Sequence, residues 1–146
     1  MEKLLHFDSP REVYTADACV ISCFDARFDP ALRKFLKRRG LVAFAHVKIP
    51  GSAKALAAPT CDADRDFVLR MVRASLDLHH PPRVLLIAHN ECGAYPDAPA
   101  EAVTGDLLRA AEVLRAAEPS LRLECYFADF DGVYRVDDPH PSIATV

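Results

Sequence analysis

The chain has 146 residues, a length that fits one domain with a hydrophobic core of its own. Hydrophobic residues make up 51% of the sequence and the formal net charge is −3, so the composition is that of a folded globular protein without a basic surface. We therefore expect a single domain over residues 1–146 that binds neither nucleic acid nor a membrane surface.

Two features of the sequence bear on where the protein works. No apolar run approaches the ~20 residues that cross a bilayer, and residues 1–6 lack the apolar core of a signal peptide. The five cysteines are an odd number in a chain without an export signal, which argues against a disulfide framework. These features predict a cytoplasmic protein with reduced thiols.

The first elements expected in chain order are a short helix from Ser9 and a buried strand over Ala18–Cys23. Side chains alternate in an extended chain, so Cys23, Asp25 and Arg27 are expected to point the same way. A thiol, a carboxylate and a guanidinium then share one patch at the C-terminal end of the strand. In an open α/β sheet, ligands bind at that end.

Helices and strands alternate along the rest of the chain. In order, the pattern predicts a helix over 29–39, a strand over 41–47, a helix over 62–79, a strand over 83–88, a helix over 100–117, and strands over 121–128 and 133–136. The turn dipeptide Asp131-Gly132 joins the last two strands, and the tail over 137–146 is expected to be extended. This order predicts a three-layer α/β/α fold, with a mainly parallel sheet of four strands plus an antiparallel edge strand.

The strand over 83–88 leads to a second set of candidate ligands. His89 and Cys92 follow it, three residues apart at a strand-to-helix turn, and can both reach one metal ion. If this strand neighbours the one before Cys23, two thiolates and one imidazole converge, which is a ligand set that suits zinc. The fourth position is then left to Asp25 or to water. Periodicity alone does not fix which strands are neighbours.

At these residues the chain resembles the β-class carbonic anhydrases. The family carries Cys-x-Asp-x-Arg after one strand and His-x-x-Cys-Gly after another, which stand here as Cys23-Phe24-Asp25-Ala26-Arg27 and His89-Asn90-Glu91-Cys92-Gly93. The resemblance covers residues 17–136. It implies the zinc-dependent, reversible hydration of carbon dioxide to bicarbonate, a lyase reaction, and a first strand that lies between the second and third. Cys23, His89 and Cys92 would be the zinc ligands.

The resemblance also implies roles for Asp25 and Arg27, and a partner chain. In the family this Asp either binds zinc and closes the site, or pairs with the Arg and leaves water on the metal. Arg27 supplies a permanent cation whose planar fork matches a carboxylate. We therefore expect Asp25 to act as a gate and Arg27 as its switch partner. The family also implies a homodimer or higher oligomer, in which the second chain completes each pocket.

Two positions depart from the family pattern. Lys48-Ile49-Pro50-Gly51 stands where the family has a basic residue followed by Asn-Ala-Gly, so the basic residue and the glycine remain while the middle pair differs. Ala26 replaces the usual serine, which removes a hydrogen-bonding group beside the gate. The substrate pocket is thus expected to differ in detail from that of the family.

Three other functions remain open from the sequence. Asp25 could stay on the metal, which would give a zinc-binding protein without catalysis. The same zinc site could instead hydrolyse carbon disulfide or carbonyl sulfide. Cys23 and Cys92 could serve thiol redox chemistry, although the chain has no Cys-x-x-Cys motif.

Other cysteines and histidines have simpler interpretations. Cys19 and Cys125 fall in predicted strands and are expected to be buried core residues. His46, inside a strand pattern, is expected to be a hydrogen-bonded side chain. His79 and His80 precede two prolines and are expected at the end of a helix.

Overall fold

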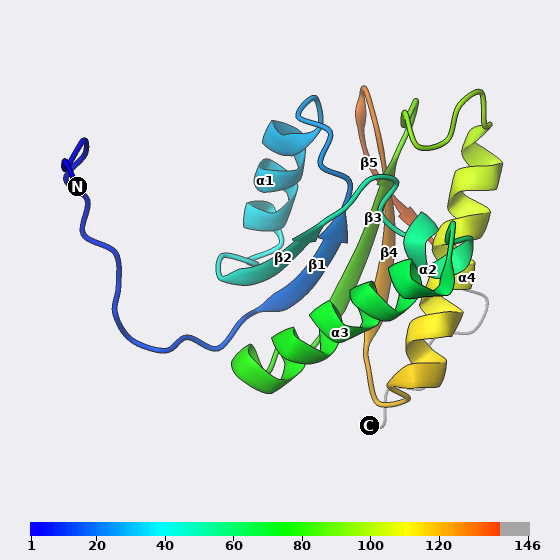
Figure 1. Ribbon diagram of the computed structural model, residues 1–146. Coiled ribbons are helices and arrows are strands. Elements are labelled where there is room, and N and C mark those ends of the chain that lie inside the picture. The colour runs from blue at the N-terminus through cyan, green and yellow to red at the C-terminus, as the bar shows by residue number, and fades with distance from the viewer. Residues whose placement is uncertain (138–146) are drawn as a thin grey trace.

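The computed structural model describes residues 1–137, which form a five-stranded sheet flanked by helices (Figure 1). In chain order the elements are β1 (Ala18–Ser22), α1 (Asp29–Arg38), β2 (Phe44–Lys48), α2 (Lys54–Ala57), α3 (Asp62–His79), β3 (Val84–His89), α4 (Ala100–Ala117), β4 (Leu123–Asp129) and β5 (Gly132–Val136). The sheet has the strand order β2-β1-β3-β4-β5. Strands β1 to β4 run parallel and β5 is antiparallel to β4, so the predicted sheet is confirmed.

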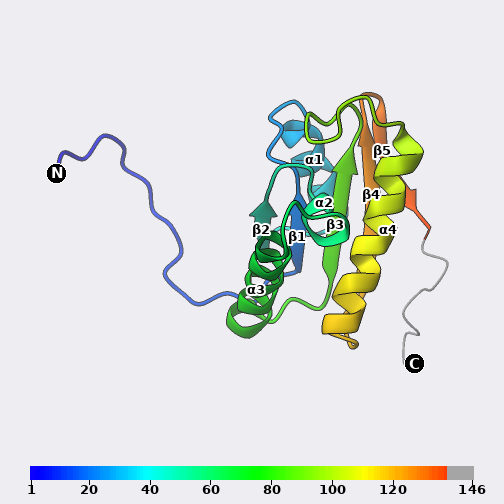
Figure 2. The same ribbon diagram turned by 45° about the vertical axis from the view of Figure 1, so that its right-hand side comes forward.

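Helices cover both faces of the sheet (Figure 2). Helix α1 packs on one face, where Leu36 joins a core with Val20 of β1. Helices α2, α3 and α4 cover the other face, where Leu107 joins a core with Ile21. Neighbouring residues of a strand thus enter different cores, because a pleated strand turns successive side chains to opposite faces. The predicted three-layer arrangement is confirmed.

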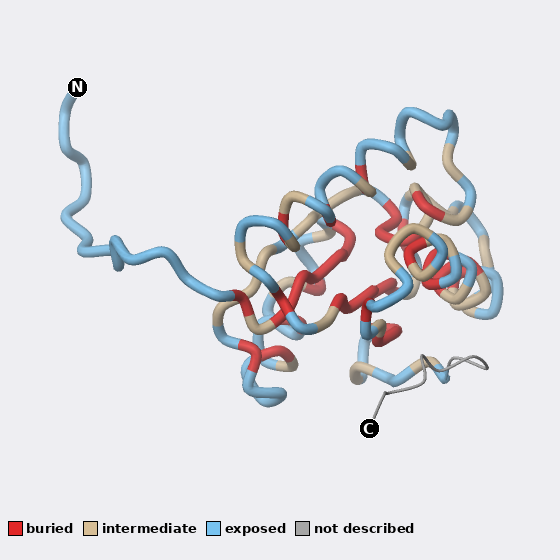
Figure 3. The backbone as a smooth tube through the Cα atoms, turned by 90° about the horizontal axis from the view of Figure 1, so that it is seen from below, coloured by how far each residue is buried: buried red, intermediate tan, exposed pale blue. Residues whose placement is uncertain are grey.

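Strands β1 and β3 form the centre of the sheet and are buried along their whole length. Buried segments gather in the middle of the molecule (Figure 3). A parallel strand covered on both faces needs a continuous apolar run rather than an alternating one. Ala18–Ile21 and Val84–Ala88 supply such runs. Any polar group that follows these two strands therefore emerges directly from the core.

The prediction of a helix from Ser9 is wrong. Residues 1–15 contain no helix and are exposed, and they lead away from the body of the protein (Figure 3). A single turn without an apolar face against the sheet lacks the packing that stabilises short helices. Conversely, the sequence pattern did not predict α2, whose four residues are held by the fully buried Leu56.

Strand β2 begins later than predicted, at Phe44 instead of position 41. The backbone N–H groups of Val42 and Ala43 donate to the Asp17 carboxylate, at 2.8 and 2.9 Å, in place of a strand ladder. Apart from Asp137, the predicted extended tail lies outside the described residues. Within residues 1–137, no helix combines the length and the apolar character needed to cross a membrane.

Candidate metal centre

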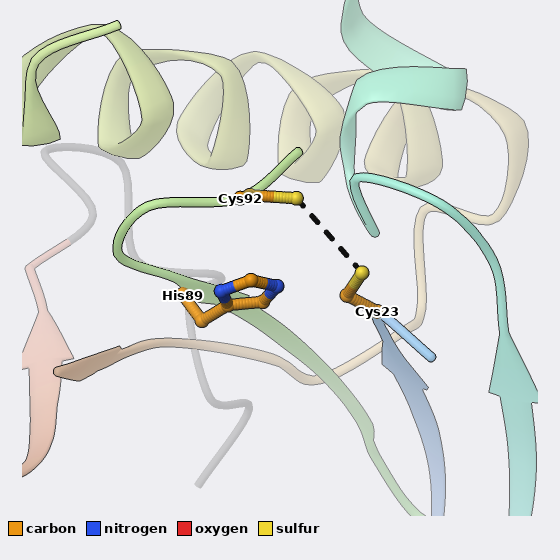
Figure 4. A group of neighbouring side chains, drawn as sticks. All are labelled: Cys23, His89 and Cys92. Atoms are coloured by element: carbon orange, nitrogen blue, oxygen red, sulfur yellow. Dashed lines mark hydrogen bonds between the residues drawn. The ribbon is translucent and has the colours of Figure 1, made fainter. Parts of the chain in front are cut away.

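Cys23, His89 and Cys92 meet at the C-terminal end of the two central strands (Figure 4). Cys23 directly follows β1, His89 is the last residue of β3, and Cys92 lies in the next turn. Because β1 and β3 pair in parallel, their ends reach the same edge of the sheet. One ligand atom from each side chain lies within 4.8 Å of the others, and the sulfur atoms are 3.9 Å apart. All three residues are buried.

These three side chains fit a tetrahedral zinc ion. With sulfur–zinc bonds of about 2.3 Å, two thiolates lie roughly 3.8 Å apart, close to the 3.9 Å between the sulfurs. The Nδ1 atom of His89 lies 2.8 Å from the carbonyl oxygen of Asn90, which accepts its hydrogen. Nε2 is buried and has no hydrogen-bond partner within the described chain. Its lone pair is therefore left for a metal.

The protonation of the three groups differs from that of isolated side chains. Burial disfavours the Cys23 thiolate, but the neighbouring His89 and nearby backbone groups lower the pKa of Cys23 to about 7. Burial also disfavours the His89 imidazolium, yet contact with Cys23 raises the pKa of His89. Burial raises the pKa of Cys92, and the negative charge of Cys23 acts in the same direction. Cys23 is thus the thiol that ionises first.

Asn90 links the turn that carries Cys92 to β4 by hydrogen bonds. The Asn90 backbone N–H donates to the Ala128 carbonyl at 2.9 Å, and its side-chain amide donates to Asp129 at 3.0 Å. Its amide oxygen accepts from the Glu91 N–H at 2.9 Å, where Glu91 has a left-handed φ of 50°. Asn side chains commonly stabilise turns in this way. Asn90 was not predicted as a site residue, because its partner Asp129 is 39 positions away in the sequence.

The loop after β2 packs against the same turn. Gly51 has a φ of 72°, and a Cβ added there would lie 2.9 Å from Ala94 Cβ, so the position requires glycine. Lys54 Nζ donates to the Ala94 carbonyl and lies 4.9 Å from the ring centroid of Tyr95. Lys54 was not predicted as a site residue either, and it holds the segment just after Cys92 through this hydrogen bond.

The remaining residues of the altered loop have other contacts. Lys48 forms an ion pair with Asp29 at the start of α1. Ile49 and Pro50 line a largely apolar pocket of about 410 Å³, together with Phe67 of α3. The pair that departs from the family pattern therefore forms part of an apolar wall.

Arg27 holds both carboxylate oxygens of Asp25. Its Nη2 lies 2.7 Å from Oδ2, its Nε lies 3.1 Å from each oxygen, and its backbone N–H donates to Oδ1 at 3.0 Å. These side-chain and backbone donors lower the pKa of Asp25 to about 2. Asp25 Oδ2 is 3.9 Å from His89 Nε2. The carboxylate thus lies beside the three candidate ligands while it is bound to the arginine.

The other cysteines and histidines named from the sequence lie elsewhere. Cys19 and Cys125 are buried in the core, as predicted. His46 hydrogen-bonds through Nε2 to the Ser22 hydroxyl at 2.7 Å, as expected of a satisfied side chain. His79 is the last residue of α3, and His80 caps the helix in a left-handed conformation, so the predicted helix end is confirmed.

Comparison with known proteins identifies the family. Residues 14–136 match the family described as "Putative carbonic anhydrase". The chain belongs to this family. An uncharacterized protein of Rickettsia bellii is 26% identical to this family member over 140 residues, which cover 87% of this chain and 85% of the relative.

Solved structures share the fold of this family member. The carbonic anhydrase of Streptococcus mutans has a TM-score of 0.64 at 15% identity, with 90% of this chain and 89% of the other covered. A tetrameric β-carbonic anhydrase of Sordaria macrospora has a TM-score of 0.51 at 12% identity, with 84% and 81% covered. A carbon disulfide hydrolase has a TM-score of 0.54 at 11% identity, with 88% and 83% covered. At these identities the likeness establishes a common fold.

Proposed function

We propose that the protein is a zinc-dependent carbonic anhydrase that reversibly hydrates carbon dioxide to bicarbonate. One observation carries this proposal beyond family membership. Asp25 is bound through both of its oxygens to Arg27 rather than aimed at the candidate ligands. The fourth side of the cluster is then left to water, which a hydration reaction needs.

Each residue of the site receives a role from its position. Cys23, His89 and Cys92 would hold zinc, which when bound would make water nucleophilic near neutral pH. Asp25 stays ionised because Arg27 lowers its pKa to about 2, so it can only accept hydrogen bonds. Its Oδ2 atom, 3.9 Å from His89 Nε2, would accept a hydrogen bond from the reacting water. Arg27 holds that carboxylate in place.

The contacts of Asp25 also bear on the non-catalytic alternative, in which this carboxylate stays on the metal. Oδ2 is 3.9 Å from His89 Nε2, so the carboxylate is close enough to reach a metal after a small movement. That movement would break the paired hydrogen bonds to Arg27. Closure would therefore cost Asp25 these hydrogen bonds, which supports the open site.

A second candidate is the hydrolysis of carbon disulfide or carbonyl sulfide at the same site. The likeness in fold to a carbon disulfide hydrolase supports it, as does the apolar wall at Ile49 and Pro50. The thiol redox alternative is less well supported, because His89 stands within reach of both sulfurs and leaves Nε2 free for a metal.

The deciding experiment is stopped-flow hydration of carbon dioxide by zinc-loaded protein, from about pH 6.5 to about pH 9. Carbon disulfide and carbonyl sulfide are offered in parallel assays. A rate above buffer with carbon dioxide supports the proposed reaction. Activity on the sulfur compounds alone would favour the second candidate, and a zinc-loaded but inert protein would favour the closed site.

A further inference from the structure

The Arg27 guanidinium makes contacts beyond its pairing with Asp25. Its Cζ atom lies 5.7 Å from the ring centroid of Phe28 and 5.6 Å from that of Phe130. Its Nη2 also donates to the Glu91 carbonyl at 3.0 Å. Two aromatic rings, a carbonyl and a carboxylate therefore contact one cation, at distances where a ring attracts a guanidinium, and the Arg27 side chain remains 50% exposed.

The two rings differ in what else they do. Phe28 is only 4% exposed, belongs to the core under α1, and packs against His89 in a tilted arrangement with ring centroids 4.4 Å apart. Phe130 is 59% exposed and lies in the turn between β4 and β5. Its ring centroid is 5.3 Å from that of Phe28. Phe130 thus contributes little to the core, and its side chain can be changed without disturbing a candidate ligand directly.

The turn that carries Phe130 is fixed relative to the candidate metal site. Asp129 Oδ1 accepts from the Phe130 backbone N–H at 2.8 Å and from the Asn90 amide at 3.0 Å. Asn90 in turn shapes the segment between His89 and Cys92. Asp129 therefore connects the turn that carries Phe130 to the turn that carries Cys92.

We propose that Phe130 is a positioning residue for the gate formed by Asp25 and Arg27. Its ring covers the guanidinium and attracts it, so that Arg27 loses a favourable contact if it swings into solvent. While Arg27 stays, it keeps the Asp25 carboxylate away from the fourth side of the cluster. This consequence for the metal rests on the proposed function, whereas the contact between Phe130 and Arg27 does not.

The first test uses the metal-free protein and needs no activity. The Arg27 Nε–H donates to both oxygens of Asp25, so its exchange with water, measured by NMR, reports how often the pair opens. Phe130→Leu removes the aromatic face and keeps an apolar side chain. We expect exchange to be about two- to fivefold faster, the size of a partly exposed cation–π contact. Unchanged exchange would overturn the proposal.

Phe67→Leu is the matched control. Phe67 is 48% exposed, and Arg70 Cζ lies 5.8 Å from its ring centroid, so it repeats the exposed Arg–Phe contact away from the gate on α3. We expect Arg27 exchange to be unchanged in this variant. Equal acceleration in both variants would point to general loosening and would also overturn the role of Phe130.

The second test follows azide binding by the visible spectrum of the cobalt(II)-substituted protein. Azide needs the position that Asp25 would take, so Phe130→Leu should weaken its binding, by at most about two- to fivefold. If Phe130→Leu binds azide as tightly as the parent and its Arg27 Nε–H exchange is unchanged, Phe130 has no role in positioning the gate. The proposed function would remain intact. A parent that binds cobalt but no azide would contradict the open site, and the exchange ratio would still decide the role of Phe130.

Discussion

At the scale of single residues, the site depends on two thiols that share one small volume. Cys23 titrates at about 7, whereas burial and the Cys23 charge raise the pKa of Cys92. A divalent cation removes this conflict, because it neutralises both thiolates at once. Without such a cation Cys92 stays protonated beside the Cys23 thiolate, whereas a bound divalent metal would let both thiols ionise.

The proposed ligand set gives the first prediction. Purified protein is expected to contain about one zinc per chain by elemental analysis. Cys92→Ser should lose most of this zinc, because three protein ligands are reduced to two. Cys61→Ser is the control, since Cys61 is an exposed free thiol. Zinc retained equally by Cys92→Ser and the parent would show that the ligand assignment is wrong.

The gate gives the second prediction. Arg27→Ala should keep its zinc but lose carbon dioxide hydration by at least ~100-fold, comparable to the loss of one well-placed electrostatic group. Without its partner, Asp25 is free to occupy the fourth position of the metal. In the parent, the rate should rise from low values below neutrality toward about pH 8, because two thiolate ligands make the bound water less acidic. Stopped-flow rates across this range measure both effects.

A substitution of a different arginine serves as the control for that experiment. Arg73→Ala removes an arginine that pairs with Glu118 on the surface, so it should hydrate carbon dioxide like the parent. If Arg27→Ala also keeps the parent's rate at every pH, the pair formed by Asp25 and Arg27 is not a gate.

At the scale of elements, the sequence predicted the strands better than it predicted their order. Continuous apolar runs mark β1 and β3, and each is followed by its motif, so the candidate ligands could be chosen from the sequence. Periodicity does not say that β1 lies between β2 and β3; that order came from the family resemblance and is confirmed. Asn90 and Phe130 could not be predicted, because their partners are distant in sequence. The pairing of β3 with β4 brings Asp129 to Asn90, and Phe130 also needs the pairing of β1 with β3 to reach Arg27.

The loop after β2 gives the third prediction. Gly51→Ala combines a strained φ with a contact of 2.9 Å to Ala94, whereas Gly40→Ala has a similar φ of 73° and no described neighbour within 4 Å. Both should lose roughly 1 kcal/mol of unfolding free energy from backbone strain. Gly51→Ala should lose a further ~1–3 kcal/mol from overpacking, and it should also weaken zinc binding. Urea unfolding measures the difference, and equal losses in the two variants would contradict the proposed close packing.

The end of the sheet opposite the metal site gives the fourth prediction. The Glu124 side chain is 2% exposed and pairs with Arg39, Arg83 and Arg122. Although burial opposes it, the Tyr126 hydroxyl and these arginines lower the pKa of Glu124 below its ordinary value of 4.5. Because the folded value is the lower one, the carboxylate stabilises the fold above about pH 4.5, and this contribution is lost as pH falls through the folded pKa.

Glu124→Gln should therefore lower the unfolding free energy at neutral pH by roughly 2–3 kcal/mol, a modest value for a buried ion pair because Arg122 is largely exposed. The difference in unfolding free energy between Glu124→Gln and the parent should become smaller at acidic pH. Glu118→Gln, which removes a surface partner of Arg73, should change stability little. A gap that stays constant from neutral pH down to about pH 3 would exclude a linked carboxylate.

At the scale of the whole molecule, the fifth prediction is a homodimer or higher oligomer at micromolar concentration. Leu4, Leu5 and Phe7 are 86%, 79% and 75% exposed in the extended N-terminal segment. A second copy would cover such side chains, since apolar residues gathered on one exposed segment commonly mark a contact surface. Sedimentation velocity of the full chain measures it, and a monomer would also weaken the enzyme proposal.

The parallel pairing of β1 with β3 has a consequence for the lifetime of the protein. Cys23 and Cys92 are 69 positions apart, so the cluster exists only after a long stretch of chain has closed on itself. An ion bound there would form a reversible cross-link between distant parts of the polypeptide. Its binding would stabilise the native state by mass action. Scarcity of the metal would then leave more chains open to proteases. The cellular abundance of this protein would follow the supply of its metal.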